Sequence, residues 1–116
     1  MLSLVPMLQT KDMDRTIAWY QSVLGFAVAD RSNEGDWCYL TRDGAAIMFA
    51  NIAEWGQPQA TATQYFYTDD VMGWWNAIKD RFTAEWGPEE MPYGMLEFAI
   101  KDPNGYLLSF GQEIRS

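Results

Sequence analysis

The stretch YGMLEFAIKDPNGYLLSFGQ, residues 93–112, decides the fold, because it has the pattern of two strands joined by a tight turn. Apolar residues alternate on both sides of Asp102-Pro103-Asn104-Gly105. Proline presets the backbone angle φ of a turn and glycine accepts a positive φ, so these four residues predict a hairpin. The polar side chain of Ser109 lies in the middle of the second strand, and its role is the first question that the sequence raises.

This hairpin ends a series of elements that the chain repeats twice. In the first half, Asp12 is a good N-cap and Gly25 is placed to end the helix that follows it. The strands expected around this helix are residues 3–10, 26–31, 36–42 and 45–51. In the second half, Asp69 or Asp70 caps a helix that extends to Phe82. The strands expected around the second helix are residues 62–68, 83–89, 95–101 and 106–112.

The order of elements therefore predicts an α+β fold built from two βαβββ modules. The modules are expected at about residues 1–51 and 62–116, and residues 52–61 read as a linker rich in Gly, Pro and small polar residues. A chain of 116 residues suits a single domain, residues 1–116, with one core.

Composition and charge exclude several classes of function. Eight basic and sixteen acidic residues give a net charge of −8, which disfavours nucleic acid and anionic membrane surfaces as partners and favours cationic ones. We expect no signal peptide, because the first residues include no basic region, and no membrane span, because no apolar run is long enough to cross a bilayer. A single cysteine, Cys38, is consistent with the reducing cytoplasm. The chain has no histidine, so Ser-His-Asp and Cys-His catalysis and the usual zinc sites are excluded.

Two segments resemble the motifs of one family. DMDRTIAWYQSVLGF (residues 12–26) and YGMLEFAIKDPNGYLLSF (residues 93–110) resemble the opening and closing motifs of the vicinal oxygen chelate superfamily, also called the glyoxalase/bleomycin resistance/dioxygenase superfamily. The resemblance implies curled, cup-shaped mixed sheets with helices on the convex side, and a homodimer. It does not fix the function, because the superfamily contains lyases, dioxygenases, transferases and non-catalytic drug-binding proteins.

The resemblance also places four metal-ligand positions, where metal-dependent members of the family carry histidine, glutamine or glutamate. In this chain the four positions are Val5, Met48, Gln64 and Ser109. Only Gln64 keeps such a side chain, and one neutral amide cannot hold a divalent cation. Gln9 and Glu97 are conceivable replacement ligands, but a polar residue in an apolar strand is more often hydrogen-bonded. We therefore expect no metal, no cofactor and no catalytic residue of the family's usual kind.

The cup implied by the resemblance would be apolar and aromatic, since 18 of the 116 residues are Phe, Trp or Tyr. Aromatic faces give a large contact area and attract cations. The residues expected to contact a ligand are Met7, Trp37, Tyr39, Met48, Gln64, Phe66, Glu97 and Ser109. The nearest analogue within the family is its bleomycin-resistance branch, whose members bind a drug and sequester it.

Three hypotheses follow from these observations. The first is a metal-free binding protein for a flat or cationic small molecule, such as a bleomycin-like antibiotic. The second is an enzyme of the same fold in which Glu97, Tyr39 or Gln64 polarises a substrate or moves a proton. The third is a module whose cavity is filled by its own Met and Trp side chains. We take the first as the working hypothesis.

Overall fold

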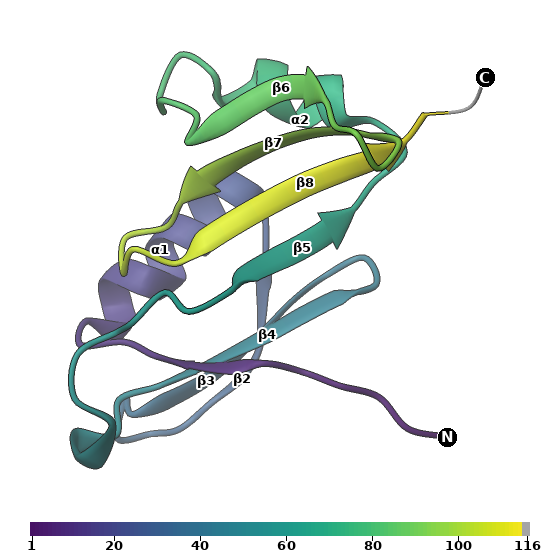
Figure 1. Cartoon of the computed structure of the whole chain (residues 1–116). Helices are drawn as coiled ribbons and strands as arrows, with labels where there is room; N and C mark the ends of the chain where they lie inside the picture. The colour runs from purple at the N-terminus through teal and green to yellow at the C-terminus, as the bar shows by residue number, and fades with distance from the viewer. Residues whose placement is uncertain (115–116) are drawn as a thin grey trace. The chain divides into compact units, whose positions relative to one another are not determined.

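The computed structural model describes residues 1–114, which form two compact units (Figure 1). Unit 1 is Met1–Gln59 and unit 2 is Ala60–Ser116. Within the described residues, each unit contains one four-stranded mixed sheet and one α-helix. This arrangement confirms the predicted pair of βαβββ modules. The expectation that both modules form a single domain stays a prediction.

The sheet of unit 1 has the strand order β1-β4-β3-β2. β1 runs parallel to β4, and the other pairs are antiparallel. The elements of unit 1 are β1 (Met7–Gln9), α1 (Met13–Leu24), β2 (Ala27–Arg31), β3 (Trp37–Arg42), β4 (Ala45–Ala50) and the short 3-10 helix η1 (Ala53–Trp55).

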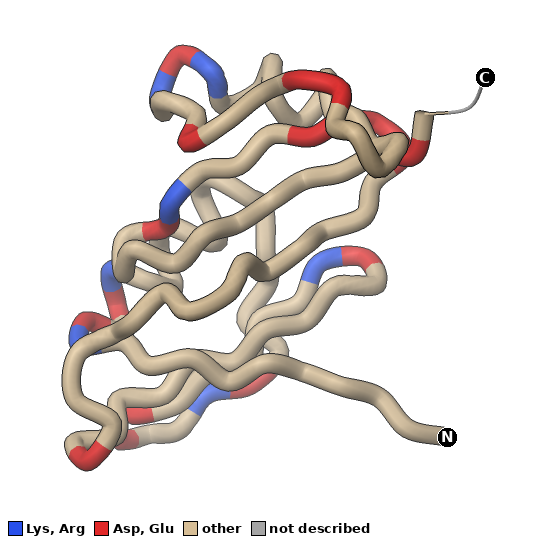
Figure 2. The backbone as a smooth tube through the Cα atoms, in the orientation of Figure 1, with Lys and Arg blue, Asp and Glu red and all other residues tan. Residues whose placement is uncertain are grey.

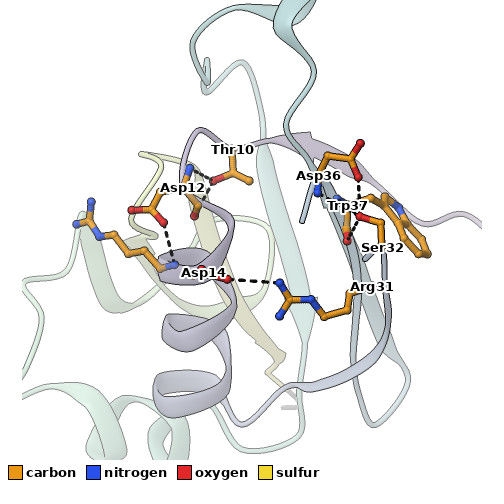
Figure 3. Close-up of polar contacts among 8 residues, drawn as sticks. Thr10, Asp12, Asp14, Arg31, Ser32, Asp36 and Trp37 are labelled. Atoms are coloured by element: carbon orange, nitrogen blue, oxygen red, sulfur yellow. Dashed lines mark hydrogen bonds and ion pairs between the residues drawn. The ribbon is translucent and has the colours of Figure 1, made fainter. Parts of the chain in front are cut away.

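Helix α1 packs against one face of this sheet through the apolar side that its sequence predicts. The ring of Tyr20 is completely buried, and its centroid lies 5.1 Å from that of Phe49 on β4. The carboxylate of Asp12 caps the helix by accepting a hydrogen bond of 3.1 Å from the backbone N–H of Arg15 (Figure 3). Gly25 ends the helix in the left-handed conformation, as expected.

Polar contacts also tie β2 to its neighbours. Nη2 of Arg31 lies 3.4 Å from Oδ1 of Asp14 on α1. The hydroxyl of Ser32 donates to the carboxylate of Asp36 and accepts from the backbone N–H of Trp37, which closes the turn between β2 and β3 (Figure 3). This turn fixes the point at which β3 begins, and with it the face on which the Trp37 side chain lies.

The sheet of unit 2 has the matching order β5-β8-β7-β6, with β5 parallel to β8. Trp74 and Trp75 of the helix α2 pack on Phe110 and Phe98 of the sheet, each with ring centroids 5.2 Å apart. The elements of unit 2 are β5 (Thr63–Tyr67), α2 (Val71–Ile78), β6 (Trp86–Glu90), β7 (Met95–Lys101) and β8 (Leu107–Glu113).

Three expected boundaries are wrong. The first strand begins at Met7 and not at residue 3, and β6 begins at Trp86 and not at residue 83. Helix α2 ends at Ile78 and not at Phe82, because the backbone N–H of Arg81 bonds to the carbonyl of Ile78 and tightens the chain into a turn. Of the two candidate N-caps of this helix, Asp70 makes the capping bond, a 3.0 Å contact with the backbone N–H of Gly73.

Candidate functional site

The face of each sheet opposite its helix is called here the distal face, and in unit 1 it carries four of the predicted ligand residues. Met7, Met48 and Tyr39 lie in one cross-strand row, because Met48 is paired with both of the others. Trp37 lies in the next row, and its ring centroid is 6.5 Å from that of Tyr39. These side chains are half-buried or exposed, whereas the alternate residues of β3 and β4 are buried under α1. The sequence therefore placed this group on one face correctly.

Gln9 lies on the same face, and both ends of its amide are hydrogen-bonded to a loop. Its Oε1 accepts from the backbone N–H of Ile52, and its Nε2 donates to the carbonyls of Ile52 and Gly56. These three bonds of 2.8 to 2.9 Å fix the segment that contains η1 and the half-exposed side chain of Trp55. Gln9 thus holds a loop in place and is not a replacement ligand.

In unit 2, the face that we expected for Gln64 and Phe66 is wrong. Gln64 pairs with Leu108 and Phe66 pairs with Phe110, and these partners lie under α2. The ring of Phe66 stacks on Phe110 at 5.1 Å, as part of the core of unit 2. The distal face of β5 instead presents the alternate residues Thr63, Tyr65 and Tyr67.

Ser109 does lie on the distal face, and its role is a cross-strand hydrogen bond. The residue is fully buried, and its Oγ lies 2.7 Å from Oγ1 of Thr63 on β5. It pairs in register with Tyr65 on one side and Ala99 on the other. At the position where metal-dependent relatives carry a ligand, this chain therefore joins two strands through paired hydroxyl groups.

The chemically distinctive feature of this face is the carboxylate of Glu97 in β7, which is only 2% exposed and accepts three hydrogen bonds from aromatic side chains. The hydroxyls of Tyr65 and Tyr93 donate to Oε1 at 2.7 and 2.6 Å. The indole N–H of Trp86 donates to Oε2 at 2.7 Å. We call these four residues the Glu97 cluster. Three aromatic rings from three different segments therefore meet at one buried negative charge.

Tyr65 reaches Glu97 because residue 111 of β8 is glycine. A Cβ atom at Gly111 would overlap the hydroxyl end of the Tyr65 ring. Trp86 reaches the carboxylate from the other side through an irregularity in β6, where the register with β7 shifts between Trp86 and Glu89. Gly87 occupies this bulge with φ +74°, and a Cβ atom there would overlap the carbonyl oxygen of Glu97.

The hydrogen bonds of the cluster control its ionisation. Burial alone raises the pKa of Glu97, but the three bonds from Tyr93, Tyr65 and Trp86 outweigh burial, and the pKa lies below its ordinary value. Burial and the bond to Glu97 raise the pKa of Tyr65. The bond to Glu97 raises the pKa of Tyr93, which is 61% exposed, to about 12. At neutral pH the carboxylate is charged and both phenols keep their protons.

The residues at the family's ligand positions do not fit a divalent metal. Val5 and Met48 offer no hard donor, Gln64 lies on the helix-covered face, and the Ser109 hydroxyl is bonded to Thr63. Within residues 1–114, no group of three His, Cys, Asp or Glu side chains could hold a metal ion.

A groove of about 610 Å³ opens beside the Glu97 cluster at the ends of β5 and β8. Gly111 forms part of its lining, and Tyr67, whose ring centroid lies 5.0 Å from that of Tyr65, forms another part. The complete lining is Tyr67, Thr68, Asp69, Gly111, Gln112 and Glu113. β5 carries no charged side chain and β8 carries only Glu113 at its end, so the charged residues of the lining are Asp69 and Glu113, both acidic (Figure 2).

Sequence reasoning identified Glu97 as a candidate but missed the three residues that surround it. One signal was available: an acidic residue in the middle of an apolar strand needs hydrogen-bond donors, and Tyr93 is the polar aromatic residue nearest to it in sequence.

Comparisons with known proteins agree on the fold. Residues 4–110 match the family model of the Glyoxalase/Bleomycin resistance protein/Dioxygenase superfamily. A bleomycin-binding protein in complex with bleomycin has 24% sequence identity and a TM-score of 0.78, over 97% of this chain and 99% of that one. The bleomycin resistance determinant of transposon Tn5 has 24% identity and a TM-score of 0.79, over 97% and 98% of the two chains.

An enzyme has a similar fold. A lactoylglutathione lyase from Agrobacterium tumefaciens has 19% identity and a TM-score of 0.75, over 95% of this chain and 92% of that one. No curated protein sequence matches the chain significantly. In residues 1–114 no helix combines the length and apolar character needed to cross a membrane. At these identities the structural similarity establishes the fold. It does not distinguish a binding protein from an enzyme.

Proposed function

Because this chain belongs to the Glyoxalase/Bleomycin resistance protein/Dioxygenase superfamily, we propose that it binds a small organic molecule and sequesters it without a metal ion. The observation that carries the proposal is the set of side chains at the family's ligand positions. Val5 and Met48 are apolar, Gln64 faces the helix, and Ser109 is bonded to Thr63. Such a set supports contact with a ligand and not coordination of a cation.

The chemistry of the distal faces favours a flat ligand with a positive charge. In unit 1, Met7, Met48, Trp37 and Tyr39 form an apolar and aromatic surface. In unit 2, the Glu97 cluster adds three aromatic rings and a negative charge. The net charge of −8 attracts cations to the chain as a whole. A bleomycin-like antibiotic combines these ligand properties, and two of the similar structures are a bleomycin-binding protein and a bleomycin resistance determinant.

A second candidate function is catalysis that uses Glu97. The observation that favours it is the similar fold of a lactoylglutathione lyase. The hydrogen bonds argue against Glu97 as a proton donor, because they hold its pKa below the ordinary value. As a base it is poorly placed too, since all three of its donors are the protein's own side chains and it is 2% exposed. The third hypothesis, a self-filled cavity, predicts no ligand response at all.

The proposal includes partners and location. We propose a homodimer in the cytoplasm that binds neither nucleic acid nor membranes. The acidic charge supports the absence of nucleic acid as a partner. The buried thiol of Cys38, whose pKa is raised by burial, suits a reducing compartment in which it stays unreactive.

The test is a titration of tryptophan fluorescence with a bleomycin-class antibiotic, with and without added divalent metal. We expect saturable quenching that is independent of free metal and weakens as salt is raised. Met48→Lys, which places a positive charge on the distal face, should weaken binding at least tenfold. Ala29→Lys, the matched control, adds the same charge at an exposed position of β2 and should leave binding unchanged.

Each other outcome has a definite meaning. A flat response to the antibiotic would eliminate it as the ligand. A response that requires free divalent metal would overturn the metal-free proposal. Formation of a chemically altered product would replace sequestration by catalysis.

A further inference from the structure

The Glu97 carboxylate is a buried negative charge that has no basic partner within residues 1–114. The ion pairs of the described residues use the carboxylates of Asp14, Asp43 and Glu85, and none uses Glu97. Its hydrogen-bond donors are the two phenols and the indole. Among residues 1–114, the cluster therefore keeps a full negative charge among aromatic rings, with no ion pair to Lys or Arg.

Such a charge is not needed for packing. Removing a carboxylate from water is costly, and apolar side chains of similar volume at such sites are often equally or more stabilising. The cluster also needs glycine at two places, Gly111 below Tyr65 and Gly87 beside Trp86. The Glu97 cluster thus depends on six residues: its own four and these two glycines. This supports a role of the cluster in recognition.

We propose that Glu97 is a positioning residue that holds Tyr65, Trp86 and Tyr93 as a recognition surface for a planar organic cation bearing N–H groups, such as an amidinium or a guanidinium. This inference rests on the proposed function, because it assigns the charged part of the sequestered ligand to the Glu97 cluster.

The chemistry of the phenols explains this preference. Each phenol donates its proton to Glu97, so the lone pairs of its oxygen stay available to accept N–H groups. A hydrogen bond to a carboxylate is charge-assisted and increases the negative charge on the phenol oxygen. The faces of the tyrosine and indole rings attract a flat cation, and the buried charge adds to that attraction. Tyr93 is well exposed, so a ligand can reach the cluster from solvent.

The experiment compares two ligands of the same shape, benzamidinium and benzamide. Binding to the full chain would be followed through the indole N–H signal of Trp86 in NMR spectra. We expect the wild-type chain to bind benzamidinium at least tenfold more tightly than benzamide. The ratio of the affinity for benzamidinium to the affinity for benzamide should fall at least threefold in Glu97→Gln and in Tyr93→Phe. A purely structural defect would instead weaken the binding of both ligands equally.

The matched control is Glu90→Gln, which removes a carboxylate at an exposed position of the neighbouring strand β6. It should leave the ratio unchanged. Tyr93 is exposed, so Tyr93→Phe provides a folded variant even where Glu97→Gln unfolds. Equal affinity of the wild-type chain for both ligands, or an unchanged ratio in folded Tyr93→Phe, would overturn the inference. If Tyr93→Phe kept the wild-type preference for benzamidinium and still bound the antibiotic, the role of Glu97 would be refuted. The proposed function would not be affected.

Discussion

At the scale of single residues, the Glu97 cluster links ionisation to folding in alkaline solution. The bond to Glu97 raises the pKa of Tyr93 from 10 to about 12 in the folded chain. A group whose pKa is raised by folding contributes stability below its unfolded pKa and loses it as the pH rises through the folded value. Tyr93 therefore stabilises the fold below pH 10, and this contribution disappears as the pH approaches 12.

The measurement is the ultraviolet absorbance of tyrosinate during an alkaline titration. With Tyr93→Phe as the reference that identifies the signal, Tyr93 should ionise near pH 12 in the wild-type chain. In Glu97→Gln it should ionise closer to pH 10, because the charged acceptor is gone. A Tyr93 signal at its ordinary pH in the wild-type chain would contradict the hydrogen bond to Glu97.

In acid, the change of stability with pH has the opposite sign, because folding lowers a pKa there and does not raise it. Folding lowers the pKa of Glu97 from its ordinary 4.5, because the three hydrogen bonds outweigh burial. Its contribution is present above pH 4.5 and is lost as the pH falls through the lower, folded pKa. The free energy of unfolding of the wild-type chain should therefore fall more steeply in acid than that of Glu97→Gln. Parallel curves of unfolding free energy against pH would refute this.

Gly111→Ala tests the geometry that brings Tyr65 to the carboxylate. The new Cβ overlaps the Tyr65 hydroxyl, so the ring must move away and the bond to Glu97 is lost. We expect unfolding free energy to fall by about 1–3 kcal/mol, the cost of leaving a buried charged acceptor short of a donor. Gly44→Ala, at a position with no atom near the added Cβ, should change stability by less than about 0.5 kcal/mol. Equal denaturant midpoints for the two variants would be evidence against this geometry.

The same residues explain what could be predicted from the sequence. Trp37 and Tyr39 share a face because β3 alternates between these half-buried residues and the buried Cys38 and Leu40, and the register with β4 and β1 places Met48 and Met7 beside Tyr39. β5 reads Thr-Gln-Tyr-Phe-Tyr, with β-forming residues on both faces, so alternation alone could not tell which side faces the helix. The parallel register that pairs Tyr65 with Ser109 is set by tertiary pairing and is not visible in the strand itself.

At the scale of elements, N-capping decides where α2 begins. The carboxylate of Asp70 accepts from the backbone N–H of Gly73, whereas the sequence alone left Asp69 and Asp70 as equal candidates. Asp70→Ala should lower the unfolding free energy by about 1 kcal/mol. Asp69→Ala removes the same charge without the capping bond and should lower it by less than half as much. Chemical denaturation of the two variants separates these effects, and the reverse order would contradict the observed cap.

Element identity was easier to predict than element ends. Helix α1 is confirmed because its apolar period, its Asp12 cap and its Gly25 end all agree. Helix α2 ends four residues early because its last predicted turn is held by a local backbone bond, from Arg81 to Ile78, that the apolar period does not report. β6 starts at Trp86 because its pairing with β7 begins there, opposite Ala99, which the strand's own sequence does not report.

At the scale of the whole molecule, the four sheet edges differ in how well they are protected. The outer strands β2 and β6 each have a bulge and charged residues, and β6 also contains Pro88. The other outer strands, β1 and β5, are uncharged and regular in register. Natural proteins cover or pair such edges, since unprotected edge strands associate with other chains. This asymmetry supports the proposed homodimer.

Light scattering after size-exclusion chromatography should give about twice the 13.3 kDa of one chain. A lysine in the edge strand β5, introduced as Gln64→Lys, should weaken self-association because edge lysines block strand pairing. Ala29→Lys adds the same charge to β2, an edge that is already charged and bulged, and should leave the mass unchanged. A monomeric wild-type chain at micromolar concentration would contradict the homodimer.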